Sequence, residues 1–91
     1  MLRNRNSSEE TILRNFLKTK RIEKGFTQRK LSELIDNSHS FVNKYESGER
    51  YLLFTEVILI CKLLQIDPHE ITEIMDQSFN EPSESTHNIP T

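Results

Sequence analysis

Two short amphipathic segments, separated by a polar break of about three residues, constrain the fold of this chain more than any other feature. They lie within residues 27–50, and the break is centred on Asp36-Asn37. Each segment has apolar residues on one helical face and polar residues on the other. This pattern is typical of two helices that pack at a steep angle through a tight turn. We therefore expect a pair of short helices whose outer polar face is free to contact a partner.

The first two helices are predicted from capping signals. Ser7 and Glu10 form a Ser-x-x-Glu capping box that opens a helix. Gly25 is expected to end this helix, because glycine tolerates the left-handed cap conformation. Thr27 is a favoured N-cap for the second helix. The residues of the second helix that we expect to face inward are Leu31, Leu34 and Ile35.

Three more helices are expected after the turn at Asp36-Asn37. Ser38 is predicted to cap a third helix, which Gly48 ends. A fourth helix is expected from about Phe54 to Gln65, and Asp67-Pro68 is a start signal for a fifth. The buried residues that this arrangement predicts are Val42, Tyr45, Leu52 and Phe54, with Phe41 at the edge of the core.

Composition separates one folded unit from two tails. Residues 1–6 are polar and basic, and residues 77–91 are rich in Ser, Glu, Asn, Pro and Thr, so we expect a flexible arm and a disordered tail. Residues 7–76 carry no hairpin signal, and the predicted fold class is all-α with five helices. A core of this size is marginal alone, and dimerisation would stabilise it.

The small net charge of −2 conceals a strong asymmetry along the sequence. Residues 1–30 have a formal charge of +6, whereas residues 31–91 have a charge of −8. A polarised molecule can present its basic side to phosphates while its far side repels them. The alternative interpretation is an ordinary mixed surface with a chance asymmetry.

Several classes of protein are disfavoured by the sequence. No apolar run approaches the roughly 18 residues of a membrane span, and no secretion signal opens the chain. Cys61 is the only cysteine, which excludes an intrachain disulfide and a multi-cysteine zinc site and fits a reducing cytosol. We expect it to be a small core residue. His69 and His87 are isolated and no Asp, Glu or Cys set has ligand spacing, so we expect no metal. We also expect no cofactor and no enzymatic activity, because the sequence has no nucleophile–base pair and no phosphate loop.

The stretch from Leu17 to Ile71 resembles the Cro/phage-repressor helix-turn-helix family, also called XRE. The resemblance covers about 60% of the chain. Asp36 stands where the family usually has glycine in the turn, and Asp tolerates a left-handed backbone there better than most residues do. The landmarks that carry the resemblance are Lys20-Arg21, Gly25, Thr27-Gln28, Leu31, Ser38, Val42, Tyr45-Glu46, Gly48, Ile60-Cys61-Lys62, Leu64 and Ile66. The resemblance implies the five-helix lambda-repressor-like fold, with double-stranded DNA as the partner.

The family's third helix enters the major groove, and the pattern of residues here is compatible with that role. With Val42 and Tyr45 facing inward, helical spacing turns the polar residues within 38–44 outward. Asparagine bonds adenine in a bidentate way, and lysine reaches the O6 and N7 atoms of guanine. The alternative is an ordinary solvated face. The candidate base-contacting residues are Ser38, His39, Ser40, Asn43 and Lys44.

The resemblance also implies contacts to phosphate and a buried ion pair. Gln28 in this family position bonds phosphate and braces the third helix. The other candidate phosphate contacts are Arg29, Lys30, Arg50 and, in the arm, Arg3 and Arg5, although each is equally compatible with a plain surface position. Family members that carry the residues matching Arg21 and Glu46 bury them as an ion pair between the first and third helices.

The fourth helix and the segment before it are too apolar for a monomer to bury completely. We therefore predict a homodimer, with Leu53, Leu59 and Leu63 as its principal contacts. Cover by the arm or the tail is the alternative.

The function that the sequence predicts is a sequence-specific transcriptional regulator in the cytosol, most simply a repressor that reads a near-palindromic operator. A protein-interaction module that keeps the fold without binding DNA is the alternative, and the acidic second half of the chain supports it modestly.

Overall fold

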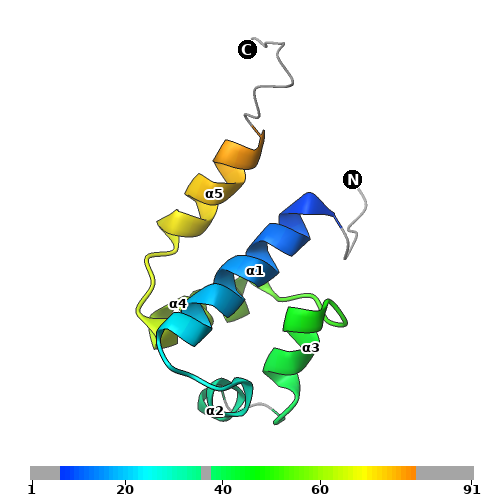
Figure 1. Cartoon of the computed structure of the whole chain (residues 1–91), viewed down its shortest axis with the longest axis vertical. Helices are drawn as coiled ribbons and strands as arrows, with labels where there is room; N and C mark the ends of the chain where they lie inside the picture. The colour runs from blue at the N-terminus through cyan, green and yellow to red at the C-terminus, as the bar shows by residue number, and fades with distance from the viewer. Residues whose placement is uncertain (1–6, 36–37, 80–91) are drawn as a thin grey trace.

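Five helices make up the described part of the chain, which covers residues 7–35 and 38–79 of a computed structural model (Figure 1). No strand occurs within these ranges, so the predicted all-α class is confirmed. Helix α1 crosses the centre of the molecule, α2 and α3 pack together at one end, and α5 lies along α1 and extends away from them. The helices are α1 (Ser8–Glu23), α2 (Gln28–Leu34), α3 (Phe41–Ser47), α4 (Phe54–Leu64) and α5 (His69–Phe79).

Side-chain caps at the predicted residues begin three of these helices. The Ser7 hydroxyl accepts a hydrogen bond from the backbone N–H of Glu10 at 3.3 Å. The Thr27 hydroxyl does the same for Lys30 at 3.0 Å, and Asp67 Oδ1 accepts from the backbone N–H of His69 at 2.9 Å. Each bond satisfies an N–H group that has no partner within its own helix.

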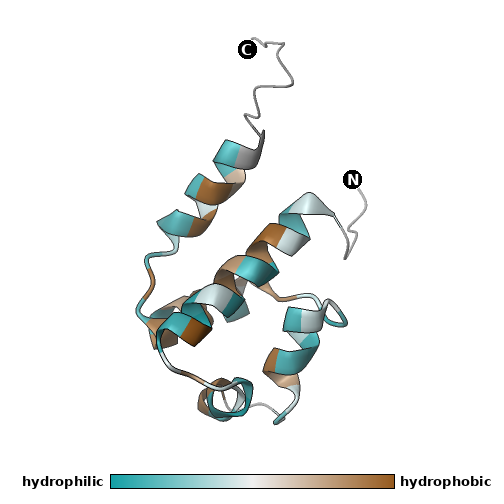
Figure 2. Ribbon diagram, viewed as in Figure 1, coloured by the Kyte–Doolittle hydropathy of each residue, from teal (hydrophilic) through white to brown (hydrophobic). Residues whose placement is uncertain are grey.

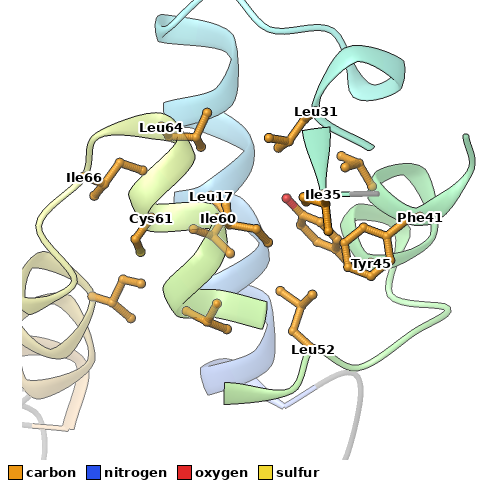
Figure 3. Packing of buried hydrophobic residues seen from close by; sticks show 13 residues of the cluster. Leu17, Leu31, Ile35, Phe41, Tyr45, Leu52, Ile60, Cys61, Leu64 and Ile66 are labelled. Carbon is orange, nitrogen blue, oxygen red and sulfur yellow. The ribbon is translucent and has the colours of Figure 1, made fainter. Parts of the chain in front are cut away.

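The core lies where α1, α2, α3 and α4 meet (Figure 3). Figure 2 shows that α1, α3 and α5 each carry both hydrophobic and hydrophilic residues. The buried side chains of the core include Leu17 of α1, Leu31 of α2, Tyr45 of α3 and Ile60 of α4, each with no exposed surface. Cys61 is fully buried among them, as predicted, and burial raises the pKa of its thiol. The thiol is therefore a packing group in its neutral form.

Three apolar residues lie in positions that the sequence did not predict. Leu34 is 43% exposed, because the inward face of α2 is centred on Leu31 and Ser32 instead. Phe41, expected at the edge, is only 2% exposed and lies edge-to-face against Tyr45, with ring centroids 5.5 Å apart. Phe54, expected in the core, is 77% exposed, because the chain places Leu52 in the core and begins α4 at Phe54 itself.

Two predicted boundaries also differ from the structure. Helix α3 begins at Phe41 with Ser40 as its N-cap, so Ser38 lies in the preceding turn and does not cap the helix. The backbone N–H of Phe41 bonds the Ser38 carbonyl at 3.1 Å and closes that turn. Helix α5 continues to Phe79, so residues 77–79 are helical. The predicted arm, the Asp36-Asn37 turn and the tail from residue 80 lie outside the described residues.

An ion pair fixes the connection between α3 and α4. Both terminal nitrogens of Arg50 donate to the Glu56 carboxylate, each at 2.9 Å, and the guanidinium lies 4.7 Å from the centre of the Phe41 ring. Glu56 also accepts from the backbone N–H of Leu53 at 2.8 Å. Arg50 therefore covers Phe41 while its partner Glu56 caps α4, which explains why Phe41 is buried.

Replacing Glu56 should make stability less dependent on pH. The hydrogen bonds from Arg50 hold the pKa of Glu56 below its ordinary range. A carboxylate with a depressed pKa stabilises the fold above the ordinary glutamate value of about 4.3, and this stabilisation disappears as the pH falls further. We expect wild type to exceed Glu56→Gln by up to about 1 kcal/mol near neutral pH, and the difference to shrink in acid. Chemical unfolding near neutral pH and in acid measures the difference in stability between the two proteins. A difference that is constant with pH would contradict a depressed pKa of Glu56.

Candidate DNA-binding interface

Helix α3 is held against α2 by a buried serine. Ser32 has no exposed surface, and its hydroxyl donates to the Gln28 carbonyl at 2.8 Å. The same oxygen accepts from the backbone N–H of Val42 at 3.1 Å. Val42 is the second residue of α3, where a backbone N–H has no partner within the helix, and the Ser40 side chain makes no cap bond. Ser32 therefore caps α3 from the neighbouring helix and fixes the angle between the two.

Removing the Ser32 hydroxyl should destabilise the packing of α3 against α2. In Ser32→Ala the Val42 N–H remains buried without its partner, so we expect a loss of about 1–3 kcal/mol in the free energy of unfolding. Ser47→Ala is the matched control, because Ser47 is exposed and its hydroxyl bonds only groups at the end of α3 and beyond it. Equal stability of the two variants in chemical denaturation would refute the capping role of Ser32.

An ion pair joins α1 to the end of α3, between the two residues that the resemblance singled out. Arg21 Nε lies 2.7 Å from Glu46 Oε2, and Arg21 Nη2 lies 3.2 Å from Glu46 Oε1. Arg21 also donates to the Phe26 carbonyl at 2.7 Å. The side chains of Arg21 and Glu46 are only 9% and 3% exposed. This bidentate geometry, shielded from water, is the kind that makes a charge-assisted pair strong.

The outer surface of α3 and the turn before it are polar. Ser38, His39, Asn43 and Lys44 are exposed, and Ser40 is half-buried. Asn43 Nδ2 donates to Gln28 Oε1 at 3.4 Å, and Gln28 Nε2 donates to Glu46 Oε1 at 2.9 Å. The Gln28 side chain thus connects the start of α2 to α3, in the bracing position that the resemblance implied.

Comparison with protein families identifies the architecture. A family model described as Helix-turn-helix matches residues 17–71, which is more than half of the chain. The chain belongs to the Cro/C1-type helix-turn-helix family, also called XRE. Its five helices fit a lambda-repressor-like helical fold. Searches among curated proteins and among solved structures gave no match.

Membership of the XRE family makes this chain a DNA-binding regulatory domain, and the cations beside α3 are in keeping with that class. Arg29 and Lys30 are exposed at the start of α2. Arg29 forms an exposed pair with Glu33 at 3.4 Å, and Glu33 Oε2 also lies 3.6 Å from His39 Nε2. Such exposed pairs contribute little to stability, because water competes for the same charged groups. Arg29 and Lys30 are therefore both accessible to a phosphate.

Arg50 is in a different situation from the other candidate phosphate contacts. Its guanidinium is already bound to Glu56, to the Tyr51 carbonyl and to the face of Phe41. A phosphate would have to compete with all three. The sequence analysis did not predict Glu56 as its partner, and the signal in the sequence is an opposite charge six residues later, just inside the start of α4.

The three candidate dimer contacts differ in exposure. Leu53 and Leu59 are 60% and 38% exposed, whereas Leu63 is partly buried against the core. A separate apolar groove of about 330 Å³ lies between α1, α4 and α5, and none of the three leucines lines it. Leu13, Phe54, Ile58, Ile71 and Met75 are among its lining residues. The exposed Phe54 therefore extends the apolar surface from Leu53 into this groove.

Two further observations concern the same described part of the chain. Within residues 7–35 and 38–79, no helix combines the length and the apolar character that a membrane crossing requires. Over the same ranges, no group of three or more His, Cys, Asp or Glu side chains is arranged to hold a metal ion.

Proposed function

We propose that this XRE-family protein is a repressor of transcription that binds a near-palindromic DNA site as a homodimer in the cytosol. The observation that carries the proposal is the exposed polar face of α3, which includes Asn43 and Lys44 and is joined to the cationic start of α2 by the Asn43–Gln28 hydrogen bond. In this arrangement α3 enters the major groove, and Ser38, His39 and Ser40 approach the bases or the adjacent backbone from the preceding turn.

Contacts to phosphate fix the orientation of the protein on the duplex in this proposal. Arg29 and Lys30 bind phosphates from the start of α2, and Gln28 contributes the N–H that Glu46 does not use. Arg50 is not included, because its guanidinium is bound within the protein. Repression then follows from occupancy of DNA that the transcription machinery needs.

The homodimer is supported by the apolar surface around the start of α4. Leu53 and Phe54 are among the most exposed large apolar side chains of the described residues, and Leu59 lies farther along α4. Leu53 and Phe54 are adjacent in the sequence, and neighbouring exposed apolar side chains mark an association surface more often than a single one does. Sedimentation analysis tests this part, and a protein that stays monomeric at tens of micromolar would contradict it.

Selection of bound sequences from a random duplex pool tests the function itself. The proposal predicts enrichment of a near-palindrome with half-sites about 10 base pairs apart. A folded, dimeric protein that enriches no sequence would instead support a protein-interaction module with this fold. Salt dependence distinguishes the two further, because displacement of counterions makes DNA binding fall steeply as salt rises.

A further inference from the structure

We infer that the buried Arg21–Glu46 pair determines, through the Gln28 amide, which hydrogen-bonding groups Asn43 offers to DNA. Gln28 and Glu46 are then positioning residues for base recognition, in addition to any role in stability or phosphate binding. The inference rests on the proposed function for its consequence on DNA, but its structural part applies to the free protein.

The contacts form a continuous chain from the protein interior to its surface. Arg21 donates to both oxygens of Glu46, which fixes the carboxylate beside α2. Glu46 Oε1 accepts from Gln28 Nε2 at 2.9 Å, and Gln28 Oε1 accepts from Asn43 Nδ2 at 3.4 Å. The Glu46 side chain is almost completely buried, whereas Asn43 is exposed on α3. The buried ion pair therefore fixes the orientation of the Gln28 amide, and the Gln28 amide in turn fixes the orientation of the exposed Asn43 side chain.

The chemistry of the groups gives this chain a direction. An ionised carboxylate only accepts hydrogen bonds, so Gln28 must turn its NH₂ group toward Glu46. Because an amide has an oxygen at the end opposite its NH₂ group, the Gln28 oxygen must then point toward Asn43. An oxygen there accepts but cannot donate, so Asn43 must turn its own NH₂ group inward.

This orientation leaves Asn43 with a defined set of groups for the major groove. One N–H is used by Gln28, while the carbonyl oxygen and the second N–H remain free. An acceptor beside a donor complements the N6 donor and N7 acceptor of adenine. If the Gln28 amide were reversed, it would occupy the Asn43 oxygen and leave only N–H donors, which suit acceptors such as those of guanine. The chain of contacts therefore favours adenine opposite Asn43.

The side-chain amide resonances of Asn43 test the structural part without DNA. Gln28→Ala removes the acceptor but leaves the Arg21–Glu46 pair in place. We expect the Asn43 NH₂ signals to shift and to exchange faster with solvent in this variant. Arg29→Ala is the matched control, since Arg29 is the next residue on α2 and pairs with Glu33 instead. Asn43 signals that respond equally to both substitutions, or to neither, would overturn the inference whether or not the protein binds DNA.

Base preference tests the consequence for recognition. Asn43→Ala first locates the base pair that Asn43 reads in the selected duplex. At that pair we expect wild type to prefer adenine by about fivefold or more, and Gln28→Ala to lose most of this preference. If Gln28→Ala lowers affinity equally for every base and retains the preference, Gln28 is only a phosphate contact and the inference is wrong. If wild type binds no duplex, the proposed function fails, and the amide resonances still decide the structural part.

Discussion

Glu46→Gln is expected to lower the melting temperature by more than about 10 °C. The substitution keeps the shape of the side chain but leaves the Arg21 guanidinium, whose side chain is 9% exposed, without its counter-charge. Loss of one partner of a buried ion pair costs about 3–5 kcal/mol, and in a domain of this size each kcal/mol corresponds to about 4–8 °C. Thermal unfolding followed by circular dichroism measures the effect.

Glu73→Gln is the matched control for this experiment. Glu73 is exposed on α5, and its replacement changes the net charge by the same amount. We expect its stability to lie within about 0.5 kcal/mol of wild type. If the Glu46 variant had the same melting temperature as the control, the ion pair between α1 and α3 would contribute nothing to stability. The Gln28–Asn43 contacts would then have no fixed partner in the protein interior.

The second large effect is expected on DNA affinity, from Asn43→Ala. Asparagine that bonds a base in a bidentate way contributes about 1–3 kcal/mol of discrimination. A symmetric dimer makes the contact in both half-sites, so the loss doubles to about 2–6 kcal/mol, which corresponds to a decrease of about 30-fold or more in affinity for the selected duplex. Binding to a scrambled duplex should change little, because that binding depends on phosphates.

Titrations with the selected and the scrambled duplex measure this difference, and Asn15→Ala provides the control. Asn15 is an exposed asparagine on α1, outside the proposed interface. Its variant should bind both duplexes as wild type does. A parallel loss of affinity for both duplexes in Asn43→Ala would assign Asn43 to the phosphate backbone, and no loss at all would remove it from the interface.

Local signals in the sequence were sufficient for most of the helices. Capping residues such as Ser7 and Thr27 bond their neighbours three residues along, so that their geometry is encoded within one turn of the chain. The core residues of α1 and α3 likewise follow from helical spacing, as for Tyr45. The family resemblance added the Arg21 and Glu46 pairing, whose partners are 25 residues apart and share no local pattern.

The errors arose where contacts between elements decide the outcome. Phe41 is buried because Arg50 covers it, and the position of Arg50 depends on Glu56 in the next helix. Leu34 is exposed because the inward face of α2 is centred on Leu31 and Ser32, whereas periodicity alone suggests a stripe that includes Leu34. Proximity in the sequence predicts Ser38 as the cap of α3, but the hydroxyl that bonds the Val42 N–H belongs to Ser32 of α2.

Amide chemical-shift mapping of the folded protein with the selected duplex determines whether α3 and the start of α2 form the surface that reads DNA. The largest shifts should fall on residues 38–44 and on Gln28, Arg29 and Lys30, and they should remain localised there at moderate salt. Largest shifts on α5 or around Leu53 and Phe54, or none along α3, would contradict a DNA-reading role for that surface.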